Sequence, residues 1–185
     1  MHLSDPRHRA FWAEFRTSLP ENSSVPSLPN GVFSFDDNKY GAAVSALAVL
    51  EGRKTATSAL ARPFDRGEEP FPTPGDHAIV TLFDGTPYAV IRISHWNRVC
   101  FGKVDERFAG AEGAESLAAW KRTQYRYHGQ FCRAIGTPLN DDTEFLRIYF
   151  QVLYPEPVVL DARCADIPVM IDVEDAEVVA EAGPG

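Results

Sequence analysis

Residues 52–58 read Gly-Arg-Lys-Thr-Ala-Thr-Ser, which places two cations and three hydroxyls directly after an apolar stretch. That stretch, residues 38–51, predicts a helix that Gly52 can end. Backbone N–H groups and cations at a helix end can bind an anion or a base edge. Lys54 and Thr57 are three residues apart, so a helical or 3₁₀ turn would put both on one face. The alternative is a solvated helix end with Lys54 near the negative pole of the helix dipole.

Further elements are expected on both sides of this segment. Asp5 and Pro6 are typical of a helix start. The aromatic residues after them predict a helix that ends near Pro20 and a loop over 20–31. Four prolines and two glycines predict another loop over 61–76.

The second half of the sequence predicts strands around a helical insert. The expected elements are a strand at 77–83, a hairpin turn at Asp84-Gly85, a strand at 87–99, two helices within 104–131 separated near 110–113, and strands at 145–154 and 158–160. This order favours an α+β fold with a small, mostly antiparallel β-sheet or barrel and flanking helices. Neither GxGxxG nor GxxxxGK[ST] is present, so the phosphate cradle of nucleotide-binding folds is missing.

The composition indicates about one domain with a packed core. The chain has 185 residues, of which 44% are hydrophobic and 24% are charged. Its net charge of -8 argues against a protein that coats nucleic acid broadly, because such binding depends on cationic charge. A local basic site remains compatible with this balance.

The same residues argue against other classes. No apolar run approaches the roughly 20 residues of a membrane helix, and the N-terminal residues lack the apolar segment of a secretory signal, so no membrane association is expected. The three cysteines form no CxxC motif, which favours a reduced, cytoplasmic setting. No histidine lies at zinc-type spacing from another histidine or a cysteine, so we expect no metal site and no cofactor.

Two further segments carry candidate functional residues. Glu112 is flanked by glycines, so it can be presented on a tight turn, or it can simply begin the next helix. Residues 120–133 hold four fixed cations and no acid. On a helix, Arg122, Arg126 and Arg133 would share a face, which either follows a phosphate backbone or is merely solvated. A second stripe is expected to face the core: Leu117, Trp120, Gln124, Tyr127 and Phe131.

Together these segments resemble the ASCH domain family, whose fold is PUA-like. The resemblance spans residues 33–154 and implies a β-barrel with flanking helices and a cleft that relatives use on RNA or modified nucleosides. We expect an N-terminal helix and loop at 1–32, the ASCH domain at 33–160 and an acidic extension at 161–185. The matching motifs are Phe33-Ser34-Phe35-Asp36, Leu50-Glu51-Gly52-Arg53-Lys54-Thr55-Ala56-Thr57, Pro74-Gly75-Asp76, Gly85-Thr86-Pro87, Ala89-Val90-Ile91-Arg92-Ile93, Ala109-Gly110-Ala111-Glu112-Gly113 and Trp120.

The resemblance also implies a site. Some small bacterial members look like amidohydrolases that remove the acyl group of N4-acylcytidine with the Lys and Thr of a Lys-x-x-Thr motif and a later Glu. The matching positions here are Lys54, Thr57 and Glu112. Two positions depart from the family: Ala59 stands where those amidohydrolases carry Arg, and Gln124 where long bacterial members often carry His. Substrate contacts are expected from Arg53, Thr55, Ser58, Trp120, Arg122 and Arg126.

Three hypotheses about function remain open. In the first, Thr57 attacks an amide on a nucleobase or positions a water, Lys54 acts as the base, and Glu112 protonates the leaving amine or orients Lys54. Backbone N–H groups after Gly52 are expected to bind the oxyanion of this reaction. The second is RNA binding with or without strand cleavage, because another bacterial member is reported as a ribonuclease. The third is a non-catalytic interaction module, which predicts a shallow cleft with Lys54 solvated and far from Glu112. A monomer or a weak homodimer is expected.

Overall fold

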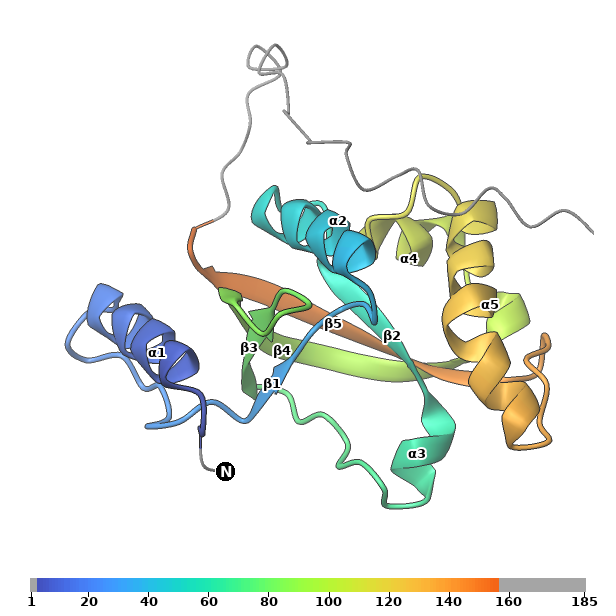
Figure 1. Ribbon diagram of the computed structural model, residues 1–185, viewed down its shortest axis with the longest axis horizontal. Coiled ribbons are helices and arrows are strands. Elements are labelled where there is room, and N and C mark those ends of the chain that lie inside the picture. Colours follow the sequence, from blue (N-terminus) through green and yellow to red (C-terminus); the bar gives the residue numbers. More distant parts are fainter. Residues whose placement is uncertain (1–2, 157–185) are drawn as a thin grey trace, which may run out of the picture.

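The computed structural model describes residues 3–156 as a curled five-stranded sheet surrounded by helices (Figure 1). The strand expected at 158–160 and the acidic extension at 161–185 lie outside the described residues. The helices are α1 (Pro6–Ser18), α2 (Lys39–Leu50), α3 (Ala61–Asp65), α4 (Glu106–Ala111) and α5 (Leu117–Ala134), with a 3₁₀ turn at Phe101–Lys103. The strands are β1 (Gly31–Phe33), β2 (Ala56–Leu60), β3 (His77–Thr81), β4 (Pro87–Cys100) and β5 (Glu144–Tyr154).

The sheet is an open half-barrel. Its strand order is β1-β3-β4-β5-β2, with β1 parallel to β3 and the other neighbours antiparallel. The long β4 and β5 strands shift register at Val90/Ile91 and Ile93/His95, and such irregularities increase the bend and twist of a strand. The curl brings the edge strands β1 and β2 towards each other without pairing them (Figure 1).

The core consists of three apolar clusters that lie on different sides of this curl. On one side, Trp12 and Phe15 of α1 pack against Ile79 and Val90 of the sheet. On the inside of the curl, a cluster built mainly from β3, β4 and β5 includes Val49 of α2. The third cluster joins β2 and β5 to α4 and α5. Figure 1 shows α2, α4 and α5 gathered near the opening of the half-barrel.

Local sequence signals are confirmed at several element ends. The side chain of Asp5 accepts a hydrogen bond from the N–H of Arg7 at the start of α1, and that of Asn38 accepts from Gly41 at the start of α2. The hairpin between β3 and β4 turns at Gly85, which has φ 81°. The expected break between the two late helices separates α4 from α5, and the late strand is β5.

Three local predictions are wrong. Residues 56–60 do not form a helical turn with Lys54, because they pair along their whole length with β5 as the strand β2. The loops predicted at 61–76 and 20–31 contain the short helix α3 and the start of β1. Tyr127 and Phe131 do not face the core but are 39% and 46% exposed. Tertiary pairing and packing override local propensity at each of these positions.

Candidate functional site

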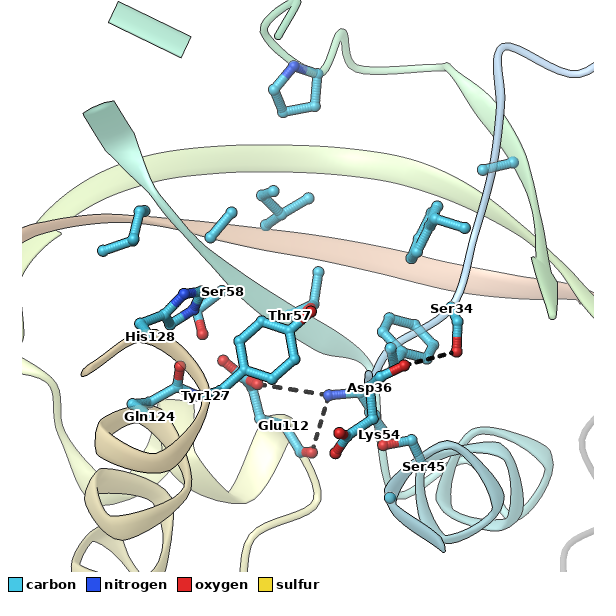
Figure 2. Close-up of a pocket in the computed structure, with 18 of the residues that line it drawn as sticks. Ser34, Asp36, Ser45, Lys54, Thr57, Ser58, Glu112, Gln124, Tyr127 and His128 are labelled. Carbon is cyan, nitrogen blue, oxygen red and sulfur yellow. Dashed lines mark hydrogen bonds and ion pairs between the residues drawn. The ribbon is translucent and has the colours of Figure 1, made fainter. Parts of the chain in front are cut away.

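A cavity of about 1180 Å³ occupies the opening of the half-barrel. Its lining includes residues of both edge strands, β1 and β2, together with the β1–α2 loop, α2 and α5. An open barrel leaves side chains and backbone groups of its edge strands unpaired, so the opening is the natural position for a ligand. Figure 2 shows the polar side chains that meet there.

Lys54 enters this cavity from the turn after α2. Gly52 has φ 70°, and the N–H groups of Arg53 and Lys54 both donate to the carbonyl of Ala48, which ends the helix. The Lys54 residue is only 5% exposed. Its ammonium nitrogen lies 4.7 Å from the centre of the Phe35 ring, a cation–π contact.

Glu112 lies directly opposite Lys54. The Lys54 Nζ donates to the Glu112 carbonyl oxygen at 3.1 Å and lies 3.4 Å from its Oε2 (Figure 2). Both side chains are more than nine-tenths buried. The turn after α4 forms at Gly113, whose φ of 84° is a left-handed conformation that favours glycine.

One carboxylate oxygen of Glu112 has no partner. Its Oε1 is buried and accepts no hydrogen bond in the described structure. The Ser58 hydroxyl and the Trp120 indole N–H likewise have no hydrogen-bond partner among the described residues, and all three residues line the cavity. A buried polar atom without a partner costs about 1–3 kcal/mol, so such atoms indicate places where a ligand or water binds.

The strand β2 presents side chains on two sides of its edge. Ala56 and Leu60 pack in the cluster that joins β2 to α5, so the alternation of a strand directs Ser58 to the same side. Thr57 points to the other side, and both Thr57 and Ser58 line the cavity. The cavity therefore wraps around the free edge of β2.

The α5 wall contributes uncharged polar side chains and one cation. Gln124 is 6% exposed and lines the cavity with Tyr127 and His128. Burial lowers the pKa of His128 to about 4, so its imidazole is neutral near pH 7.

Arg126 of α5 lies 3.3 Å from Asp36 of the β1–α2 loop, and this ion pair links two walls of the cavity. Burial, and then the neighbouring Asp37, raise the pKa of Asp36.

The pKa of His128 predicts a pH dependence of stability. The unfolded chain binds a proton at this residue near pH 6.5, whereas the folded chain does so only near pH 4. Stability is therefore lost as the pH falls from 6.5 towards 4, by about 3 kcal/mol from this residue. Urea unfolding at pH 7 and pH 4 measures the loss, and His128→Phe should reduce it. An equal loss in wild type and variant would contradict the prediction.

The structure brings most of the expected site residues into one cavity. Lys54, Thr57, Glu112, Ser58 and Arg126 all line it. Trp120 also reaches the lining, but it is only 2% exposed. It packs on Phe101 and Phe108, so its main contacts are with the core.

Three expected substrate contacts lie outside the cavity lining. These are Arg53, Thr55 and Arg122. The Arg53 side chain is 56% exposed and pairs with Glu51. The expectation of an oxyanion site at the backbone after Gly52 is also wrong, because the N–H groups of Arg53 and Lys54 donate to Ala48 and that of Thr55 to Ala111.

Sequence reasoning missed three residues of the cavity. Phe35 lies within a recognised motif, yet its contact with Lys54 has no local signal. The sequence predicts Gln124 in a core stripe and gives His128 no role, although their spacing of four residues places both on one face of a helix.

Among residues 3–156, no cluster of His, Cys, Asp and Glu suits a metal ion. Within the same range, no helix is long and apolar enough to cross a membrane.

Comparisons with known proteins agree with this architecture. The family model described as ASCH domain matches residues 31–154. The chain is similar to the crystal structure of an ASCH domain from Lactobacillus crispatus JV V101, with 26% identity and a TM-score of 0.75 over 80% of this chain and 95% of that one. It is also similar to a protein from Enterococcus faecalis V583, with 25% identity and a TM-score of 0.69 over 79% and 87% of the two chains.

The search of curated proteins gave no match. The family match covers most of the chain, and the half-barrel agrees with the fold of the solved ASCH structures. ASCH domains are PUA-like domains for which RNA binding has been suggested. This chain belongs to the ASCH domain family.

Proposed function

We propose that this protein hydrolyses an amide on a modified nucleoside of the N4-acylcytidine type. The observation that supports this most directly is the buried contact between Lys54 and Glu112 at the cavity, 3.4 Å apart. A non-catalytic module would be expected to carry Lys54 in solvent and far from Glu112. A cation and a carboxylate buried together in a cavity that Thr57 also lines are typical of acid–base chemistry.

Each residue has a role in the proposed reaction. Thr57 supplies the attacking hydroxyl or holds the attacking water. Once a proton has passed from Lys54 to Glu112 over their short separation, Lys54, as the free amine, takes the proton of that nucleophile. Glu112, as the carboxylic acid, gives a proton to the N4 nitrogen as the bond between acyl carbon and nitrogen breaks. If Thr57 attacks, water then hydrolyses the ester between Thr57 and the acyl group and returns a proton to the Thr57 oxygen. On either route, water supplies the hydroxyl group of the carboxylic acid product. At the end of the reaction Lys54 is protonated and Glu112 is a carboxylate, which restores their ion pair.

The charges of the cavity favour a nucleoside over a phosphorylated ligand. Two fixed cations and four acids line it, so the wall carries a net negative charge and opposes phosphate. The uncharged sugar and base of a nucleoside meet no such repulsion. The charged lining residues are Lys54, Arg126, Asp36, Glu69, Asp76 and Glu112.

The proposal is tested by incubating the protein with a panel of N4-acylated cytidines and following cytidine release. Thr57→Val is expected to lower the rate at least about tenfold, because it removes a hydrogen bond made in the transition state. Thr55→Val is the matched control, since Thr55 lies outside the cavity lining and should keep the rate. The absence of hydrolysis of every acylated nucleoside would reject the proposal, and equal rates in both variants would reject the role of Thr57.

RNA is a second candidate ligand, because α5 carries an exposed basic face. Arg122, Arg126 and Arg133 are exposed on that helix and recur at helical spacing. If all three contact phosphates, the logarithm of the affinity for a short single-stranded RNA should fall with the logarithm of salt concentration with a slope of about -2. Fluorescence anisotropy from low to high salt measures this slope. Affinity that does not change with salt would exclude phosphate contacts.

A further inference from the structure

A group of uncharged polar side chains lies on the α5 side of the cavity, apart from the contact between Lys54 and Glu112. Ser58 comes from β2, and Gln124 and His128 come from α5. All three line the cavity and are labelled in Figure 2. The proposed reaction uses none of them, so their polar atoms need another explanation.

These side chains are poorly explained by a structural role alone. The Ser58 hydroxyl is buried and has no hydrogen-bond partner among the described residues. The ring of His128 packs on that of Phe145, with 5.4 Å between the ring centres, so an apolar ring would suit this contact equally well. Native proteins rarely leave buried polar atoms without partners, and here the open cavity is where a partner can enter.

The two sides of β2 present different side chains to the cavity. Thr57 points to one side of the strand, while Ser58 points to the side of Trp120 and α5. A ligand that reaches around this edge can present its reacting amide to Lys54 and Glu112 and its ring to Ser58 and His128. Only uncharged groups meet the ring in this arrangement.

We propose that Ser58, Gln124 and His128 form a recognition subsite for the hydrogen-bonding edge of a pyrimidine base. This inference rests on the proposed function and names the part of the substrate that these residues bind. A serine hydroxyl, a glutamine amide and a neutral imidazole each offer a donor and an acceptor. Together they match an uncharged heterocycle that carries a carbonyl oxygen and a ring nitrogen. An apolar ring would leave them unsatisfied, which is an effective basis for specificity.

The experiment measures binding and catalysis separately. Isothermal titration with cytidine, the product of the proposed reaction, needs no turnover. Ser58→Ala and His128→Phe are each expected to weaken cytidine binding about tenfold, by loss of a hydrogen bond to the ligand. In hydrolysis of N4-acetylcytidine, both should raise KM by a similar factor and leave kcat nearly unchanged.

Matched controls distinguish recognition from general damage. His95→Phe changes an exposed histidine that stacks on Tyr149 outside the cavity lining, and Ser94→Ala changes an exposed serine of β4, also outside the lining. Both should bind cytidine like the wild type. Ser58→Ala removes an atom without a partner, so its melting temperature should be equal to or above that of the wild type while its affinity falls. Because the affinity falls while the melting temperature does not, Ser58→Ala by itself distinguishes lost recognition from lost stability, even if His128→Phe does not fold.

The outcomes separate this inference from the proposed function. If the protein hydrolyses acylated nucleosides and Ser58→Ala and His128→Phe both retain wild-type affinity and KM, the subsite is wrong and the hydrolase stands. If no substrate is hydrolysed but the two variants weaken cytidine binding, the subsite stands and the hydrolase is wrong. A wild-type protein that binds no cytidine at millimolar concentration overturns the subsite.

Discussion

Replacing Lys54 with methionine is expected to slow amide hydrolysis by about 10²–10⁴-fold, the usual contribution of a general acid–base group. The substitution keeps most of the volume of the side chain in its 5% exposed position but removes its amine. The rate of cytidine release at saturating N4-acetylcytidine measures the effect. Lys103→Met is the matched control, because Lys103 is exposed and lies outside the cavity lining.

The same substitution is expected to destabilise the fold. Breaking a buried ion pair leaves the other charge without compensation and typically costs about 3–5 kcal/mol. Adding Glu112→Gln removes the orphaned charge, so the double variant should recover much of this stability and none of the activity. Urea unfolding of the single and double variants measures the recovery. A Lys54→Met protein with wild-type rate would show that Lys54 has no part in the chemistry.

Replacing Trp120 with alanine is expected to destabilise the protein by about 3–5 kcal/mol, because it removes a large side chain from a packed cluster. Trp120 is 2% exposed and contacts the rings of Phe101, Phe108 and Phe145. The sequence suggested a substrate contact at this position, whereas these contacts indicate that its main contribution is to stability. Urea unfolding of the variant measures the loss.

The control for this prediction is a second tryptophan. Trp96 stacks on Phe71 and is only partly buried, so Trp96→Ala should cost less than Trp120→Ala. Trp120→Phe keeps an apolar ring in the cluster and should recover most of the stability. If Trp120→Ala unfolds at the wild-type urea concentration but loses affinity for cytidine, the residue serves the ligand and not the core.

The positions of several elements follow from short-range signals in the sequence. Asp5 and Asn38 accept hydrogen bonds from N–H groups two or three residues later in the chain. The starts of α1 and α2 can therefore be predicted from the local sequence alone. Gly85 and Gly113 adopt positive φ where the sequence predicts a hairpin turn and a helix break. These features depend on backbone conformation and on neighbours within a few residues, which is the range that a local pattern describes.

Tertiary structure determines that residues 56–60 form the strand β2, and it determines the hydrogen-bond partners of the backbone just before this strand. Residues 56–60 carry no signal strong enough to exclude a helical turn, and pairing with β5, about ninety residues later, makes them a strand. The carbonyl oxygens of Ala48 and Ala111 accept hydrogen bonds from the backbone N–H groups that the sequence predicts as an oxyanion site. Tyr127 and Phe131 follow the period of a core stripe, but the cavity leaves them exposed.

The sequence by itself determined the family, the approximate order of elements and the residue types of the candidate site. Only the folded chain shows that Lys54 and Glu112, 58 residues apart, are buried in contact, and that Ser58, Gln124 and His128 line the same cavity. The physical reason is that burial and contact between distant segments depend on how the sheet curls and where it stays open. Register shifts in β4 and β5 and the packing of α2 and α5 set that geometry, and no single segment encodes it.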